Sequence, residues 1–374
     1  MKILYVSTIS DTIDAFLIPH IKFLVKQGNK VDVACNIKRE IRAKLAELRC
    51  KIYNVKFQRS PIKKENYIAY KKIKKIVLEE KYELVHTHTP IASFITRIAC
   101  RNITNLKIVY TTHGFHFFKG ASLKNWLIYY PIEKLAAKWT DCIITINKED
   151  YAVAKKMKMR KPNSVFLIHG VGIDLNKFSY INFREKDQLR KKYGYSIDEF
   201  ILFYAAELNN NKHQDLLIKS VYLIKSREIN VKLLLAGEGD LYEQYRKQVD
   251  RLGLNNDVIF LGFREDIANL LKISDIVVAS SKREGLPVNV MEAMVAGLPL
   301  IVTNCRGQRD LVNNNENGYI IEINNIVGFA DAVERLYYSE ELRKKFGERS
   351  LEVIKKYSIE DVLKELKEVY LIII

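Results

Sequence analysis

Two glutamates eight positions apart mark the stretch of this chain whose residue types and spacing are best suited to chemistry. Glu284 precedes a Gly-Leu-Pro loop, and Glu292 lies in a helix that is predicted to run from about Pro287 to Val295. Proline suits the first turn of a helix, because the N–H that it lacks would have no partner there. The stretch therefore reads as a loop that leads into a short helix, with one carboxylate in each.

The start of that helix is a candidate anion site. The backbone N–H groups of Val288, Asn289 and Val290 would point at whatever lies before the helix, and such groups bind phosphate well. A carboxylate on each side would repel the phosphate unless it binds something neutral. A nucleotide-sugar has this layout, since hydroxyl-rich sugar and ribose lie on either side of a diphosphate.

Further candidate residues follow predicted strands. Lys212 begins a helix beyond the strand Ile201–Ala205, where a lysine can bind phosphate, although a solvated surface lysine is the commoner case. His86 and His88 lie at the end of one strand, and His113 follows another. A His-x-His pair can bind a metal, but no third ligand has convincing spacing, so no metal site is expected. His113 fits an active-site cleft and an ordinary packed position equally well.

One stretch of the first half combines aromatic and basic residues. Its members are Phe115, Phe117, Phe118, Trp126, Tyr129 and Tyr130, with Lys119, Lys124, Lys134 and Lys138. This composition is typical of a helix in a membrane interface, and also of a core helix with a charged rim. We favour the interface, because Phe-Phe-Lys-Gly at 117–120 reads as a loop. A second basic strip at 63–75 fits a solvated helix face.

Length and composition describe a globular protein of two domains. The chain has 374 residues, of which 48% are hydrophobic and 28% charged. No run of about 18 apolar residues occurs, and the N-terminus is too short for a signal peptide, so neither a membrane span nor secretion is expected. The five cysteines are odd in number and widely spaced, which favours a reducing cytosol.

Charge is unevenly distributed along the chain. The first 180 residues carry a net charge of +19 and the rest −2. The first half is therefore expected to meet a polyanionic surface, namely anionic lipid, a phosphate-bearing acceptor or nucleic acid, although solubility alone is an alternative. No nucleic-acid recognition motif occurs, so nucleic acid is not an expected partner. The absence of G-x-G-x-x-G and of a P-loop argues against a dinucleotide oxidoreductase and an NTPase.

Short buried strands alternate with helical patterns in both halves. The predicted strands are Ile3–Ser7, Val31–Asn36, Leu84–His88, Ile108–Thr112, Cys142–Ile146, Val165–Ile168, Ile201–Ala205, Lys232–Ala236, Val258–Leu261, Ile276–Ala279, Leu300–Thr303 and Tyr319–Ile321. Among the helices are Ala15–Gln27 and Leu241–Leu252. This alternation predicts α/β architecture, with a parallel, doubly wound sheet in each half.

The predicted domains are 1–175, 176–357 and a C-terminal helix, 358–374, that packs back on the first domain. The linker is expected near Gly170–Phe183. The two domains would face each other across a cleft, since ligands of such folds lie beyond the carboxyl ends of the strands. The last four residues, Leu-Ile-Ile-Ile, must be buried or contact a membrane or a partner.

At this point the chain resembles the family-4 retaining glycosyltransferases of the GT-B fold. Glu284 and Glu292 are similar to their E-x7-E signature, and the likeness continues through Ala-Met-Val-Ala-Gly-Leu-Pro at 293–299. It covers most of 200–322. In the first half it is looser, and relies on Thr-Thr-His-Gly at 111–114 and similar short runs. The chain looks most like the bacterial branch that builds capsule, exopolysaccharide or lipid-linked oligosaccharide.

The resemblance implies roles for matching residues. Glu284 would bind the donor sugar hydroxyls, with backbone groups of Gly285, Leu286 and Pro287, and Glu292 would bind the ribose. The other implied contacts are Gly262, Phe263 and Arg264 for the base, Lys212 for the diphosphate, and His113 for the sugar from the first domain. Ser7, Thr8 and His88 are candidate acceptor contacts. Such enzymes need no metal or cofactor, since basic side chains and helix N-termini stabilise the leaving diphosphate.

Two departures from the family pattern stand out. The family commonly has Gly-Arg-Leu where this chain has Ala206, Glu207 and Leu208, and a glutamate cannot replace the diphosphate contact of that arginine. Arg283, Arg306 and Arg309 are the candidate replacements. The usual glycine pair after the first strand is also missing, so the acceptor loop at 7–14 is unusual.

The sequence thus predicts a metal-independent, retaining glycosyltransferase. It would transfer a hexose or N-acetylhexosamine from a UDP-sugar to a lipid-linked (polyprenyl diphosphate) saccharide in surface polysaccharide synthesis. Its expected location is the cytoplasm, peripherally at the inner face of the plasma membrane, with the first domain on the anionic lipid. The alternative is a UDP-sugar 2-epimerase-like isomerase of the same fold.

Overall fold

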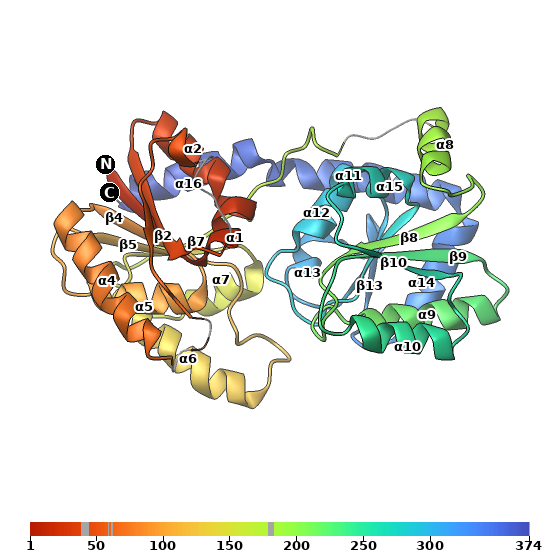
Figure 1. Cartoon of the computed structure of the whole chain (residues 1–374), viewed down its shortest axis with the longest axis horizontal. Helices are drawn as coiled ribbons and strands as arrows, with labels where there is room; N and C mark the ends of the chain where they lie inside the picture. Colours follow the sequence, from red (N-terminus) through yellow and green to blue (C-terminus); the bar gives the residue numbers. More distant parts are fainter. Residues whose placement is uncertain (39–44, 59, 61–62, 179–182, 374) are drawn as a thin grey trace. The chain divides into compact units, whose positions relative to one another are not determined.

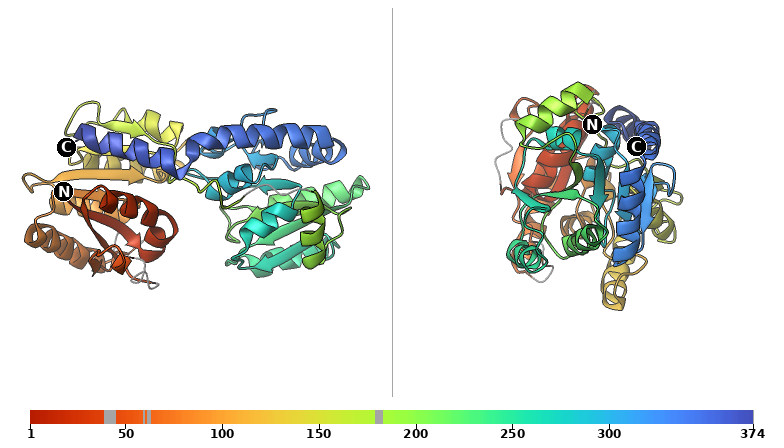
Figure 2. Two further views of the ribbon diagram at one scale, coloured as in Figure 1. Left: turned by 90° about the horizontal axis from the view of Figure 1, so that it is seen from above. Right: turned by 90° about the vertical axis from the view of Figure 1, so that its right-hand side faces the viewer.

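The chain folds into two compact units, each built on its own parallel sheet (Figure 1). The computed structural model describes residues 1–38, 45–58, 60, 63–178 and 183–373. Unit 1 comprises Met1–Gly172 and the residues from Ile359 onward, and unit 2 comprises Ile173–Ser358. The C-terminal helix, blue in Figure 2, therefore belongs to the same unit as the N-terminus.

Unit 1 contains a seven-stranded sheet in the order β3-β2-β1-β4-β5-β6-β7, and every pair of neighbours is parallel. Its strands are β1 Lys2–Ile9, β2 Lys30–Asn36, β3 Ile52–Asn54, β4 Leu84–Thr87, β5 Lys107–Thr112, β6 Cys142–Thr145 and β7 Val165–Leu167. The central strands are buried along nearly their whole length, because helices cover both faces.

The helices of unit 1 form two layers. Those described are α1 Ser10–Thr12, a π-helical segment Ile13–Leu17, α2 Ile18–Lys26, α4 Glu65–Glu80, α5 Pro90–Cys100, α6 Leu123–Ala137, α7 Lys148–Ala154 and α16 Ile359–Ile373. Helices α4, α5 and α6 lie side by side on one face of the sheet, and α2 packs against α16 on the other (Figure 1).

Unit 2 contains a six-stranded parallel sheet in the order β10-β9-β8-β11-β12-β13. Its strands are β8 Phe200–Ala205, β9 Val231–Ala236, β10 Val258–Gly262, β11 Ile276–Ala279, β12 Leu300–Thr303 and β13 Gly318–Ile321. Its helices are α8 Phe183–Lys192, α9 Gln214–Ser226, α10 Tyr242–Arg251, α11 Ile267–Ile273, α12 Val288–Val295, α13 Gln308–Leu311, α14 Ile326–Tyr338, α15 Glu340–Ile354 and a 3₁₀ turn, Lys355–Tyr357.

The predicted strands are confirmed, with two differences elsewhere. All twelve occur within two residues of their predicted ends. The edge strand β3 was missed, because three residues are too few to show a pattern. The helix predicted over Ala15–Gln27 is instead divided, since a π-helical segment precedes α2 and Pro19 lies in the first turn of α2.

The strand order gives each unit one topological switch point. It lies between β1 and β4 in unit 1 and between β8 and β11 in unit 2. The chain leaves the carboxyl end of each of these strands toward opposite sides, which opens a crevice where ligands of such folds bind. The loops after β4, β8 and β11 carry His88, Lys212 and the stretch from Arg283 to Pro287, whereas Ser7 and Thr8 lie within β1 itself.

The apolar C-terminal tail is only partly buried. Tyr370 and Ile373 are buried in unit 1, whereas Leu371 and Ile372 are exposed. Ile374 lies outside the described residues. None of the helices in the described ranges is both long and apolar enough to span a bilayer.

Candidate functional site

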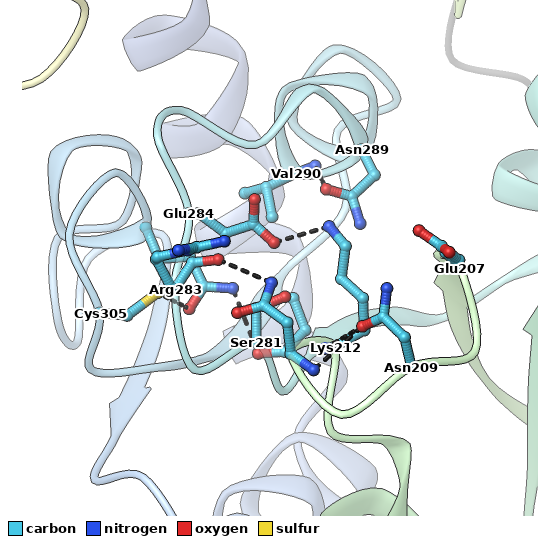
Figure 3. A network of polar contacts seen from close by, with 12 residues as sticks. Glu207, Asn209, Lys212, Ser281, Arg283, Glu284, Asn289, Val290 and Cys305 are labelled. Atoms are coloured by element: carbon cyan, nitrogen blue, oxygen red, sulfur yellow. Dashed lines mark hydrogen bonds and ion pairs between the residues drawn. The ribbon is translucent and has the colours of Figure 1, made fainter. Parts of the chain in front are cut away.

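The centre of the site in unit 2 is an ion pair between Lys212 and Glu284 (Figure 3). Lys212 Nζ lies 2.6 Å from Glu284 Oε1, and both side chains are mostly buried, with exposed fractions of 22% and 14%. Lys212 lies in the loop after β8 and Glu284 in the loop after β11, so the switch point brings them together. The two residues predicted to bind diphosphate and sugar are therefore adjacent and bound to each other.

A polar network fixes the lysine loop. Asn209 Oδ1 accepts hydrogen bonds from the backbone N–H groups of Asn211 and Lys212, at 3.0 and 2.9 Å. The Asn211 side chain donates to the Arg283 carbonyl at 3.0 Å, and the Ser280 hydroxyl donates to the Lys212 carbonyl at 2.7 Å. Sequence reasoning missed Asn209, although the run of three asparagines was a signal, because asparagine favours such side-chain-capped turns.

The start of α12 differs from the prediction in two respects. Pro287 has an extended backbone and is the N-cap of the helix, so it does not lie in the first turn. The N–H of Val290 donates to Asn289 Oδ1 at 3.0 Å, and the Asn289 side chain donates to the Ala205 carbonyl at 2.9 Å. The N–H groups of Val288 and Asn289 remain in the first turn, where the helix offers no acceptor. The anion site thus has two of its three predicted donors.

Close backbone contact supports the loop that carries Glu284. Gly307 has φ +74°, and a Cβ there would lie 2.4 Å from the Gly285 carbonyl oxygen. Arg306 is buried, and its Nε donates to the Glu284 carbonyl at 3.0 Å. Arg306 therefore braces the backbone at Glu284. Arg309 is exposed and donates to the carbonyl and side chain of Asn304.

Glu292 lies in the second turn of α12, where it is partly buried. Burial raises its pKa to about 7, against a smaller opposing effect of Lys177. Among the described residues, no hydrogen-bond or ion-pair partner compensates its charge. A carboxyl group in this setting is suited to accept hydrogen bonds from the hydroxyl groups of a ligand.

The residues predicted to line the base differ in whether they are free to contact a ligand. Phe263 is 63% exposed. Arg264 makes two hydrogen bonds to the Asp266 carboxylate, at 2.8 and 2.6 Å, which hold the pKa of Asp266 at about 2. Gly262 has φ +66° and open space around it. Phe263 is thus free to stack on a ring, whereas the Arg264 guanidinium is held by the Asp266 carboxylate.

Glu207 follows β8 and is exposed. Figure 3 shows it beside Lys212, on the side away from Glu284. Its carbonyl accepts a hydrogen bond from Gln214 at 2.9 Å, and a Cβ at Gly237 would lie 2.1 Å from the neighbouring Ala206 carbonyl oxygen. The backbone at Glu207 is therefore well fixed.

In unit 1 the structure brings the predicted histidines together. His88 Nδ1 lies 3.2 Å from His113 Nε2, and the His86 ring stacks on His88 with centroids 4.2 Å apart. Burial lowers the pKa of His113 to about 4, with a further contribution from His20. His88 is 1% exposed, so it lies behind His113 and is not on an open surface where it could contact an acceptor directly.

The C-terminal helix completes this histidine cluster. Tyr370 of α16 forms hydrogen bonds with His86 Nδ1 at 2.6 Å and with the Tyr5 hydroxyl at 3.2 Å. The other nitrogen of His86 bonds to Thr111 Oγ1 at 2.7 Å. Sequence reasoning missed Tyr370, because nothing local relates it to a histidine 284 positions away.

The other two candidate acceptor residues are also engaged within the protein. Ser7 is buried and its hydroxyl donates to the Ile9 carbonyl at 2.7 Å. The backbone N–H and the hydroxyl of Thr8 both bond to Thr89 Oγ1, at 2.9 and 2.8 Å. Thr89 has φ +55°, which is a strained conformation for a β-branched residue. Strain of this kind persists only where the surrounding structure fixes it, here beside His88.

The aromatic stretch after β5 does not form the predicted exposed interface. Phe115 and Phe117 are buried in the core of unit 1, and Trp126, Tyr129 and Tyr130 pack against them. Phe115 and Phe117 are buried because their rings stack on each other and because the Trp126 and Tyr130 rings of α6 pack against Phe117. The exposed apolar side chains of α6 are instead Leu123, Leu127, Ile128 and Leu135, with exposed fractions from 43% to 74%.

Metal ligands are not grouped in the described ranges, since no three His, Cys, Asp or Glu side chains there could hold one ion.

Two family models together match most of the chain. The model described as "Glycosyl transferases group 1" matches residues 185–353, and "Glycosyl transferase 4-like" matches residues 2–147. These ranges contain the Lys212–Glu284 site and the histidine cluster, respectively.

Individual relatives match over more than three quarters of the chain. EpsD of Bacillus subtilis (strain 168), provisionally named a glycosyltransferase, is 38% identical over 371 residues, which cover 99% of this chain and 96% of EpsD. An Escherichia coli UDP-Gal:α-D-GlcNAc-diphosphoundecaprenol α-1,3-galactosyltransferase is 32% identical, over 79% of this chain and 77% of its own. The capsular polysaccharide biosynthesis glycosyltransferase CapM of Staphylococcus aureus is 27% identical, over 99% and 96%.

Solved structures share the fold at low identity. HepE of Anabaena, crystallised with UDP and glucose, superimposes with a TM-score of 0.81 at 19% identity, over 99% of both chains. Sucrose-phosphate synthase from Thermosynechococcus elongatus gives 0.82 at 17% identity, over 99% of this chain and 98% of its own. The family models, these relatives and the shared architecture mean that the chain belongs to the group 1 glycosyl transferases and has the GT-B fold.

Proposed function

We propose that this glycosyltransferase transfers a hexose or N-acetylhexosamine from a UDP-sugar to a lipid-linked saccharide, with retention at the anomeric carbon. The observation that carries the donor half of the proposal is the Lys212–Glu284 pair at the switch point of unit 2. A cation and a carboxylate 2.6 Å apart offer one partner for a diphosphate and one for sugar hydroxyls.

The rest of the donor site follows from that pair. The N–H groups of Val288 and Asn289 would bind the diphosphate together with Lys212. Glu292 would accept the ribose hydroxyls, and Phe263 would stack on the base. Glu207 supplies no positive charge, and Arg306 braces the Glu284 backbone, so Arg283 is the arginine best placed to assist Lys212. UDP is the proposed nucleotide, because HepE was crystallised with UDP-glucose and the E. coli relative uses UDP-Gal.

The acceptor half of the proposal is supported by a relative and by charge. The E. coli relative is named for a diphosphoundecaprenol-linked acceptor. The first 180 residues, which carry the net charge of +19, include most of unit 1. A basic unit of this kind would favour an acceptor that carries a diphosphate and lies at an anionic membrane.

Unit 1 also has a surface suited to peripheral membrane contact. Helix α6 exposes Leu123 and Leu127, one turn apart, beside Lys124, and Lys134 and Lys138 are exposed further along. Exposed leucines flanked by lysines are typical of a helix that lies in the interface of an anionic bilayer. The proposed location is therefore the cytoplasmic face of the plasma membrane, in surface polysaccharide synthesis.

The proposed chemistry needs no metal and no cofactor. Lys212 and the N-terminus of α12 would stabilise the leaving diphosphate. The acceptor oxygen would attack on the face that the diphosphate leaves, and a diphosphate oxygen would take its proton. Relatives with transferase names support a transferase, and nothing observed favours the epimerase.

A donor screen followed by a transfer assay tests the proposal. Thermal stabilisation by UDP-glucose, UDP-galactose and their N-acetyl forms ranks the donors. The best donor is then supplied with polyprenyl diphosphate saccharides in the presence of a chelator, and the anomeric coupling of the product is read by NMR. Transfer is expected with retention, and Glu284→Gln should reduce it at least 100-fold, while the exposed control Glu348→Gln should not. An inverted product, a requirement for metal, or an epimerised donor without transfer would each contradict the proposal.

A further inference from the structure

The contact between His88 and His113 leaves the hydrogen positions of both rings to be determined. His88 Nδ1 and His113 Nε2 are 3.2 Å apart, so one nitrogen donates a proton and the other accepts it. The other nitrogen of His88, Nε2, is buried and has no hydrogen-bond partner among the residues that the structure describes. The two arrangements therefore differ in what is left unsatisfied at His88 Nε2.

The arrangement that leaves a lone pair, and no N–H, at His88 Nε2 is the more stable of the two. If His113 donated, His88 would carry its proton on Nε2, and that N–H would be buried without an acceptor, which is rare in folded proteins. The neighbouring rings of His86 and Tyr5 lie at 30° and 32° to His88, nearly face to face with it. An N–H in the plane of the His88 ring therefore does not point at either aromatic face.

Protonation of His88 on both nitrogens is excluded by the same surroundings. The ring is 1% exposed, and the titratable groups that act on it or contact it are three histidines and a tyrosine: His20 of α2, His86 of β4, His113 after β5 and Tyr5 of β1. None of these is a carboxylate that could stabilise an imidazolium. Burial and these histidines hold the pKa of His88 well below its usual value.

We propose that His88 fixes the tautomer of His113. His88 donates its Nδ1–H to His113 Nε2, so neutral His113 carries its own proton on Nδ1. His113 then has no free lone pair and presents a hydrogen-bond donor to substrate. This assignment rests on the proposed function only where it concerns substrate: His113 would donate to a sugar oxygen and would not act as a general base. His88 is a positioning residue that stacks on His86, and His86 is fixed in turn by its hydrogen bonds to Thr111 and Tyr370.

The tautomer can be measured without any substrate. Long-range ¹H–¹⁵N NMR of ¹⁵N-histidine-labelled protein at pH 7.5 distinguishes protonated from bare ring nitrogens, and His88 and His113 are assigned by comparison with His88→Asn and His113→Gln. The expected result is a proton on Nδ1 of both rings. A proton on His113 Nε2 overturns the proposal, whatever the enzyme transfers.

Two variants of similar size test the role of His88. Asparagine at position 88 keeps a hydrogen-bond donor close to the position of the His88 Nδ1, whereas leucine has no hydrogen-bond donor in its side chain. His88→Leu should shift His113 toward the Nε2–H tautomer and lower kcat/KM for transfer about tenfold, the value of one hydrogen bond. His88→Asn should retain the tautomer and most of the activity. Unchanged His113 signals in a folded His88→Leu variant overturn the proposal. Absence of transfer with every donor contradicts the proposed function and leaves the tautomer assignment standing.

Discussion

Lys212 and Glu284 form an ion pair across 2.6 Å and 72 positions of sequence. A nucleotide-sugar that binds as proposed must separate them, because its diphosphate and its sugar hydroxyls would each replace one partner. Donor binding therefore competes with an ion pair that is already made. The net strength of a partly buried pair of this kind is about 1 kcal/mol.

The competition predicts opposite effects of two substitutions on UDP, which lacks the sugar. Glu284→Gln releases Lys212 and should tighten UDP binding by roughly fivefold, the equivalent of about 1 kcal/mol. Lys212→Met should weaken it at least tenfold. Lys219→Met, which removes an exposed lysine paired with Asp215 on α9, is the control and should have no effect. Isothermal titration calorimetry measures all three. If Glu284→Gln weakens UDP binding, Glu284 does not restrain Lys212.

Gly307 should tolerate no side chain. Alanine there would combine a left-handed backbone with a Cβ 2.4 Å from the Gly285 carbonyl oxygen, so the Glu284 loop must move. We expect a loss of roughly 2–4 kcal/mol in urea unfolding and weaker UDP binding. Gly253→Ala, at φ +64° in open space, isolates the backbone strain and should cost only about 1 kcal/mol with normal UDP affinity. Equal losses in both variants would show that the close contact is unimportant.

The raised pKa of Glu292 predicts that unit 2 becomes less stable as pH rises. The folded chain holds this proton more tightly than the unfolded chain does, so its contribution to stability falls as pH rises from about 4.5 to about 7 and stays lost above that. Glu292→Gln removes the ionisation and should stabilise the ligand-free protein at pH 8 by up to about 3 kcal/mol, with little gain at pH 4.5. Hydrogen exchange of α12 peptides reports it, and an equal gain at both pH values would refute the assignment.

The histidine cluster predicts the opposite dependence for unit 1. Burial lowers the pKa of His20, His86, His88 and His113, so the unfolded chain takes up protons first as pH falls below about 6.5. Unit 1 should therefore lose stability on acidification, by up to ~1.4 kcal/mol for each histidine at pH 5.5. Hydrogen exchange of β4 and β5, corrected for intrinsic rates, should accelerate between pH 7.5 and 5.5. Strand β12 of unit 2, where protonation of Glu292 should instead raise stability as pH falls, is the comparison, and parallel behaviour of all three strands would argue against the cluster.

The exposed leucines of α6 predict vesicle binding that depends on them. Leu123→Ser with Leu127→Ser should weaken binding to vesicles rich in anionic lipid at least tenfold, because two apolar side chains leave the bilayer. Leu371→Ser with Ile372→Ser removes an equal number of exposed apolar side chains from α16 and should leave binding intact. Flotation of protein with vesicles measures both. If the α6 variant binds vesicles as well as the unaltered protein does, α6 is not the membrane-binding surface.

Much of the fold could be predicted because its strands are short runs of apolar residues buried on both faces. Ile276–Ala279 and Leu300–Thr303, for example, were predicted to the residue. The edge strand β3 escaped because three half-exposed residues carry no pattern. Phe115 and Phe117 were assigned to the surface because a local pattern cannot distinguish an aromatic core from an aromatic interface. Their burial depends on α6, which packs over them.

The sequence by itself determined the two sheets, the Glu284 loop with its helix, and the candidate residues at the strand ends. Only the tertiary structure decided which of these residues meet. Lys212 pairs with Glu284, and Tyr370 reaches His86, because parallel strands far apart in sequence end at the same edge of a sheet and a C-terminal helix packs beside the first strand. The tautomer that we propose for His113 likewise depends on the burial of His88, which is a property of packing and not of any local pattern.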